Sequence, residues 1–93
     1  GLSAALYGAR GGRDTLVIEG NKPGGLLTET TEVENWPGEL SIMGPDLMIK
    51  MKEQVKRFGV EFLSDAVEKV DLTCWPFHIV TEGGQSIHAL SLI

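Results

Sequence analysis

The chain has 93 residues, a hydrophobic share of 42% and a formal net charge of −5, which suits one small globular domain or a part of one. Its eight basic residues are scattered, so we expect no nucleic-acid partner, because phosphate binding needs a concentrated basic face. No apolar run of spanning length and no cationic leader are visible, so membrane spanning and secretion gain no support.

The first part of the chain predicts a helix and then a strand. Apolar residues from Leu2 onward form one stripe of a short helix that ends at Gly11-Gly12. Thr15–Ile18 is uncharged and partly β-branched, which is typical of a parallel strand covered on both faces. From Glu19 to Ile42 no period is sustained. A loop of that length in a compact domain is usually functional.

A second, longer helix is predicted from Gly44. Pro45 and Asp46 favour a helix start, and the helix runs to about Phe58 and stops at Gly59. The apolar face, which we interpret as core packing, comprises Leu47, Met48, Met51, Val55 and Phe58. The charged residues, which we interpret as a solvated face, are Lys50, Lys52, Glu53, Lys56 and Arg57.

After Gly59 the pattern changes to strands. Val60–Leu63 is predicted to return to the parallel sheet. Three further segments alternate as in an antiparallel meander with a tight turn at its glycine pair: Ala66–Asp71, Phe77–Thr81 and Ser86–Leu90. The apolar residues 90–93 are expected to re-enter the parallel sheet as a strand. His78 and His88 lie in this region without a partner at ligand spacing, so we interpret both as solvent-facing strand residues.

The single cysteine, Cys74, restricts the redox chemistry of the chain. One thiol forms neither an internal disulfide nor a zinc cluster. No basic residue stands beside it to favour the reactive thiolate, so we interpret it as a structural thiol in a turn between strands. An intracellular, cytoplasmic location is the default expectation.

Two residues suggest a dinucleotide site. Gly1 stands where the last glycine of a GxGxxG fingerprint would open a helix, whose free N–H groups and dipole favour a pyrophosphate. Glu19 ends the next strand, where an acidic residue accepts hydrogen bonds from ribose hydroxyls. Each also has a plain interpretation: a glycine that packs a helix against a strand, and a surface acid before a turn.

The most informative stretch is residues 22–38, KPGGLLTETTEVENWPG. Its glycine pair allows close backbone approach to a ligand, and a polar, threonine-rich loop leads to an ENWPG corner that we expect to be buried. With the motifs VIEG, MGPDLM, RFG, VDL and PF in the same order, the chain resembles the FAD-binding domain of the low-molecular-weight thioredoxin reductases. The resemblance covers nearly the whole chain.

The resemblance implies an α/β fold, a three-layer Rossmann-like FAD-binding domain with a parallel sheet, helices and an antiparallel β-meander. Residues 1–93 would form a partial domain, truncated at both ends, that lacks the first strand and phosphate loop. The NADPH-binding domain would be absent.

The resemblance also implies a set of cofactor-binding residues, carried over position by position: Gly1, Glu19, Gly20, Lys22, Pro23, Gly24, Gly25, Leu26, Thr30, Asn35 and Val67. Thr30 and Asn35 would hydrogen-bond the isoalloxazine edge and nearby backbone, and Val67 would offer backbone groups to the adenine. Leu26 departs from the family, which commonly has Gln there, so a side-chain contact is lost. Asn35 has a second interpretation as a turn residue that caps its own backbone.

Such enzymes pass electrons from NADPH through FAD to a Cys-x-x-Cys pair and on to thioredoxin, as homodimers. The resemblance places no catalytic residue and no metal site in these 93 residues, so the chain by itself is predicted to be inactive. Two alternatives stay open. One is a sister enzyme, either the flavoprotein subunit of alkyl hydroperoxide reductase or a ferredoxin/flavodoxin-NADP reductase. The other is a non-catalytic flavin-binding module, which Leu26 favours.

Overall fold

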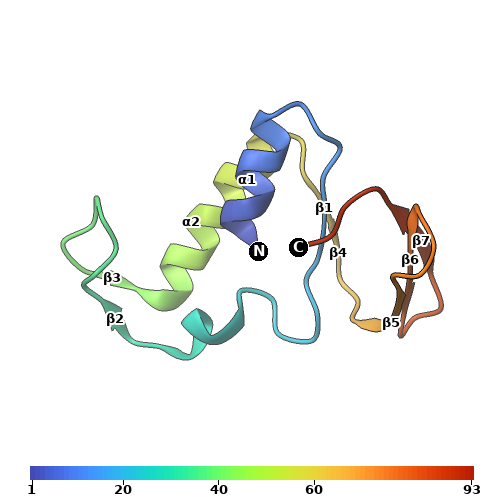
Figure 1. Cartoon of the computed structure of the whole chain (residues 1–93). Helices are drawn as coiled ribbons and strands as arrows, with labels where there is room; N and C mark the ends of the chain where they lie inside the picture. Colours follow the sequence, from blue (N-terminus) through green and yellow to red (C-terminus); the bar gives the residue numbers. More distant parts are fainter.

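The computed structural model describes residues 1–93 and arranges them in three layers (Figure 1). Two helices lie on one side of a short parallel strand pair, and an antiparallel sheet lies on the other. The elements, in chain order, are α1 (Leu2–Arg10), β1 (Leu16–Ile18), the 3₁₀ helix η1 (Gly25–Glu29), β2 (Glu32–Val33), β3 (Ile42–Met43), α2 (Gly44–Arg57), β4 (Glu61–Leu63), β5 (Val67–Asp71), β6 (Phe77–Thr81) and β7 (Ser86–Ala89). The predicted fold class is confirmed.

Both helices begin and end close to their predicted limits. Helix α1 ends at Arg10, and Gly12 with φ 76° turns the chain away. Helix α2 has Pro45 and Asp46 in its first turn, where the acid faces the positive end of the helix dipole. Gly59, with φ 81°, ends it as expected. Neither helix has the length and apolar character needed to cross a membrane.

The main core lies where the two helices meet the parallel strands. Ala5 of α1, Val55 of α2 and Val60 form its buried centre, and Val17 and Phe62 pack against it from adjacent strand positions. Val55 brings the predicted apolar face of α2 to this core, and Leu47 of the same face is also buried. Phe58 is the exception, because it lies exposed at the end of the helix with the Arg10 guanidinium 5.9 Å from its ring centre.

The parallel sheet is smaller and less covered than predicted. Strands β1 and β4 pair in parallel as expected, with Val17 opposite Phe62, but Leu16 is exposed rather than covered on both faces. The expectation that residues 90–93 form a further strand is wrong. The carbonyl of Leu90 instead accepts a hydrogen bond from Trp75 Nε1 at 3.1 Å, which ties this end of the chain to the meander.

The antiparallel meander is present as predicted. Strand β6 lies between β5 and β7, with Ile79 opposite both Val70 and Ile87. Ile79 and Thr81 are buried, so this sheet has a small core of its own. Gly84, with φ 85°, forms the tight turn between β6 and β7.

Candidate functional site

Strands β1 and β4 are parallel, so their carboxyl ends lie at the same edge of the strand pair. The start of α1 lies near the middle of the molecule, between α2 and β1 (Figure 1). Just beyond β1, the Glu19 N–H donates to the Leu63 carbonyl at 3.0 Å and the Gly20 N–H donates to the Asp65 carbonyl at 2.9 Å. Val67 opens β5 directly afterwards. Three of the residues predicted from the sequence, Glu19, Gly20 and Val67, therefore stand at this edge. It is the position where open α/β sheets bind ligands.

Glu19 is held more tightly than its sequence position suggested. Its side chain is only 7% exposed and forms an ion pair with Lys52 of α2, while Ser64 Oγ lies 3.3 Å from Glu19 Oε2. Lys52 was interpreted as part of the solvated face, and that interpretation is wrong. Met48 and Val55, which occupy the same helix face four residues before and three after it, are the signal that could have located Lys52 near the core.

The three glycines of the following loop play different parts. Gly20, Gly24 and Gly25 all have positive φ, at 72°, 90° and 64°, a conformation that L residues rarely adopt. A Cβ at Gly24 would lie 2.4 Å from Thr28 Cγ2, so this glycine allows tight packing inside the loop. A Cβ at Gly20 or Gly25 would meet nothing within 4 Å. These two positions therefore border open space that a ligand can enter.

The polar residues of the loop are largely occupied by contacts within the loop. The Thr28 hydroxyl donates to the Gly25 carbonyl at 2.7 Å, and the Thr30 hydroxyl donates to the Leu27 carbonyl at 2.8 Å. Lys22 forms an exposed ion pair of 2.5 Å with Glu29. The Thr30 oxygen keeps lone pairs for a ligand donor, whereas its proton is used to end η1.

Helix α2 anchors this loop through its first residue. The Gly44 N–H donates to the Thr31 carbonyl at 2.8 Å, and a Cβ at Gly44 would lie 2.0 Å from both Leu27 O and Thr30 Oγ1. Only a glycine permits such close backbone packing. The sequence pattern predicts Gly44 only as a helix start. Its place in the MGPDLM motif is the sequence signal that could have indicated its second role, which is close packing against the loop.

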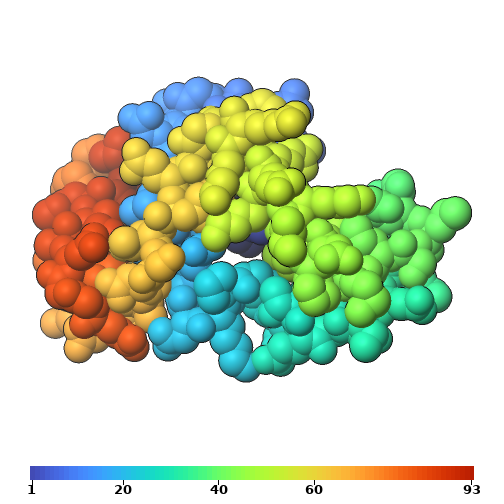
Figure 2. All heavy atoms as spheres, turned by 180° about the vertical axis from the view of Figure 1, so that it is seen from behind, coloured from blue at the N-terminus to red at the C-terminus, as the bar shows by residue number.

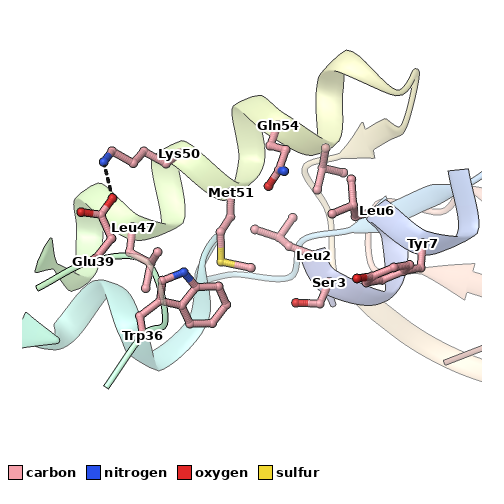
Figure 3. Close-up of a pocket in the computed structure, with 11 residues that line it drawn as sticks. Leu2, Ser3, Leu6, Tyr7, Trp36, Glu39, Leu47, Lys50, Met51 and Gln54 are labelled. Atoms are coloured by element: carbon pink, nitrogen blue, oxygen red, sulfur yellow. Dashed lines mark hydrogen bonds and ion pairs between the residues drawn. The ribbon is translucent and has the colours of Figure 1, made fainter. Parts of the chain in front are cut away.

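The ENWPG corner is exposed, contrary to the expectation of burial. Asn35 and Pro37 are exposed, and Trp36 is only partly covered. Trp36 packs beside a groove of about 310 Å³ between α1, α2 and the corner, as Figure 3 shows with Leu47 and Met51 next to its indole. No residue of the predicted cofactor set lines this groove. The groove is therefore distinct from the candidate site.

The opposite face of the molecule is hollowed between the loop and α2 (Figure 2). The hollow is bordered by the light-blue loop residues and the yellow-green helix, and the dark-blue N-terminal residues are visible within it. Glycines that border open space, a carboxylate at a strand end and an N-cap without a side-chain hydrogen bond are all present. Together they offer what a dinucleotide needs: N–H donors for phosphate and a carboxylate acceptor for ribose hydroxyls. The residues present therefore fit FAD.

Asp65 shapes the connection between β4 and Val67. Hydrogen bonds from the Thr81 hydroxyl, and then from the N–H groups of Ala66 and Gly83, hold the pKa of the Asp65 carboxyl below its usual value. These bonds fix the start of β5 against the turn that follows β6. No group of three or more His, Cys, Asp or Glu side chains is placed to hold a metal ion.

Known proteins similar to this chain in sequence and in fold include thioredoxin reductases. No family model matches the sequence. The chain is 49% identical to a thioredoxin reductase of Rickettsia felis and 50% identical to that of Rickettsia prowazekii, over 100% of this chain and 30% of each relative. It superimposes on thioredoxin reductase structures from Giardia duodenalis (TM-score 0.93, 33% identity, 99% of this chain and 30% of that one) and Lactococcus lactis (TM-score 0.90, 37% identity, 98% and 30%).

The predicted resemblance to the thioredoxin reductases is confirmed. The similarity extends along the whole chain in sequence and fold. The chain spans about 30% of the length of the thioredoxin reductases that it matches.

Proposed function

We propose that this chain is the FAD-binding part of an NADPH-dependent thioredoxin-disulfide reductase. The observation that carries the proposal is the match of the whole chain to thioredoxin reductases, combined with a carboxyl edge whose groups suit a dinucleotide. Bound FAD would take reducing equivalents from NADPH and pass them to a disulfide. The residues of this chain bind and orient that cofactor.

Each predicted residue has a place along the proposed cofactor path. The N–H groups at the start of α1, after Gly1, hold the pyrophosphate. Glu19 accepts hydrogen bonds from the adenosine ribose, and the Val67 backbone contacts the adenine. The loop of the Gly24-Gly25 pair and Asn35 would hold the isoalloxazine ring. The Thr30 hydroxyl oxygen would accept a hydrogen bond from the flavin edge. The other predicted residues would lie beside the cofactor: Gly20, Lys22, Pro23 and Leu26.

The redox partners of the cofactor are proposed to belong to residues outside these 93. The chain has one cysteine, so it supplies no Cys-x-x-Cys pair, and it has no second dinucleotide fold for NADPH. Thioredoxin is the proposed electron acceptor. The full-length protein is proposed to be a homodimer in the cytoplasm.

A second candidate function is a flavin-binding module without turnover. Leu26 favours it, because this apolar side chain is 79% exposed where the family commonly offers a glutamine amide to the flavin. The sister reductases for alkyl hydroperoxide reductase or ferredoxin/flavodoxin share the same scaffold and stay as alternatives.

One experiment separates these functions. The full-length protein is purified, its absorbance in the flavin bands is recorded, and NADPH oxidation is followed with thioredoxin and with ferredoxin or flavodoxin as acceptors. Bound FAD and thioredoxin-dependent turnover are expected. Bound FAD without turnover would favour the non-catalytic module, and absence of flavin even after incubation with FAD would exclude the proposed function.

A further inference from the structure

The ion pair between Glu19 and Lys52 joins the end of β1 to the middle of α2. The Glu19 carboxylate is 7% exposed and the Lys52 side chain 32% exposed. The two other ion pairs of the chain, Lys22–Glu29 and Lys50–Glu39, have lysine side chains that are more than half exposed. The Glu19–Lys52 pair is therefore the one shielded from water, where loss of a partner has the largest effect.

The surroundings of Lys52 fix its ammonium group in place. Its Nζ lies 4.8 Å from the centre of the Phe62 ring, close enough for a cation–π interaction. Phe62 pairs with Val17 in the parallel strands, so the ring itself is held by the sheet. Lys56 lies one turn further along α2, with its Nζ 5.8 Å from the same ring, but it forms no ion pair with a carboxylate. The chain thus contains a matched control for Lys52.

The two oxygens of Glu19 are bound by different donors. Lys52 contacts Oε1, and the Ser64 hydroxyl approaches Oε2 at 3.3 Å. An ionised carboxylate has about four acceptor positions, so positions remain for a ligand hydroxyl. A shielded carboxylate without a partner is costly and tends to turn towards water. The contact with Lys52 opposes this turn.

We propose that Lys52 is a positioning residue for FAD: it holds the Glu19 carboxylate oriented at the carboxyl edge, ready to accept hydrogen bonds from the adenosine ribose. The inference rests on the proposed function. Lys52 acts through Glu19 and does not contact the cofactor. The Ser64 hydroxyl, close to the other carboxylate oxygen of Glu19, restricts the rotation of the carboxylate.

The test compares full-length variants stripped of flavin. FAD is titrated into the wild type, Lys52→Met, Lys52→Arg and the control Lys56→Met, and the same titrations use an FAD analogue whose adenosine lacks both ribose hydroxyls. Lys52→Met is expected to weaken FAD binding about tenfold and to leave binding of the analogue within about twofold of the wild type. Arginine should restore most of the affinity, and Lys56→Met should change neither ligand.

Several results would overturn the inference. Equal weakening of FAD and the analogue would mean that Lys52 only supports the fold, and unchanged FAD affinity in Lys52→Met would remove its role altogether. If Lys52→Met does not fold, Lys52→Gln enters the same comparison, with the same outcomes. A wild type that does not bind FAD would refute the proposed function itself, and with it this inference.

Discussion

The backbone N–H of Gly44 donates a hydrogen bond to the carbonyl of Thr31 with an N–O distance of 2.8 Å. Through this bond the first turn of α2 holds the end of the loop that carries most of the proposed flavin contacts. The fit is close, since a Cβ at Gly44 would stand 2.0 Å from the Leu27 carbonyl oxygen. Loop geometry and helix position are therefore coupled at this one glycine.

Replacing Gly44 with alanine is expected to displace the loop. The new methyl group would overlap the Leu27 backbone, and overpacking of this kind costs about 1–3 kcal/mol. FAD affinity of the full-length protein should fall about tenfold or more, measured by titration of the apoprotein. Gly8→Ala is the control, because a Cβ there meets only the Thr15 side chain, at 3.1 Å; it should leave FAD affinity unchanged. Equal affinities for both variants would contradict the role of Gly44.

Asn35→Ala in the full-length protein should weaken FAD binding or shift the flavin absorbance. Asn35 is exposed in the ENWPG corner, so its amide is free to serve the isoalloxazine edge. Leu40, on the same β2–β3 connection and 99% exposed, provides the control Leu40→Ala, which should leave the spectrum unchanged. An Asn35→Ala spectrum and affinity identical to wild type would favour the plain turn role of Asn35.

The regular elements could be predicted from the sequence because their signals are local. The start of α2 at Gly44, its end near Gly59 and the three strands of the meander follow from glycines, proline and alternation. The prediction of a strand at residues 90–93 was wrong because it rested on apolar content, which does not identify the strand that would pair with it. A strand needs a free neighbouring edge, and the Leu90 carbonyl binds Trp75 instead.

The candidate site could be predicted only where a motif carries it. Glu19 and the glycine pair stand out in sequence, and the structure places Glu19 at the carboxyl edge with Gly20 and Val67. Lys52 and Gly44 could not be assigned, because their roles arise from contacts across the fold: Lys52 meets a carboxylate far away in the chain. Long-range ion pairs leave no local pattern.

Cys74→Ser should leave disulfide reduction by the full-length protein at nearly the wild-type rate. Cys74 is exposed in the turn between β5 and β6. Its Sγ lies 3.9 Å from the Asp71 carbonyl oxygen, a long contact whose loss should matter little to the fold. The chain has no second cysteine with which it could exchange. A loss of tenfold or more, with the fold intact by circular dichroism, would reveal a redox role for this thiol.

Acid should weaken the attachment of the meander through Asp65. The Thr81 hydroxyl and the N–H groups of Ala66 and Gly83 lower the folded-state pKa of Asp65 below its ordinary value. The stabilising contribution is therefore complete above the unfolded-state value of about 3.9 and is lost as the pH falls through the lower folded value. Asp65→Asn should reduce this part of the pH dependence when thermal unfolding is followed from about pH 2 to pH 7. Parallel curves for variant and wild type would contradict it.

The 93 residues expressed alone should bind FAD weakly and show no NADPH-dependent disulfide reductase activity. They contain one cysteine and span about 30% of the thioredoxin reductases that they match, so the proposed cysteine pair and NADPH site are not among them. Strand β1 pairs with β4 alone, and Leu16 beside its free edge is exposed. Unpaired edges of this kind promote association. Size-exclusion chromatography should therefore show aggregates or poorly folded material. Stoichiometric, tight FAD binding would contradict the affinity prediction, and measurable turnover with NADPH and a disulfide would overturn the assignment of roles.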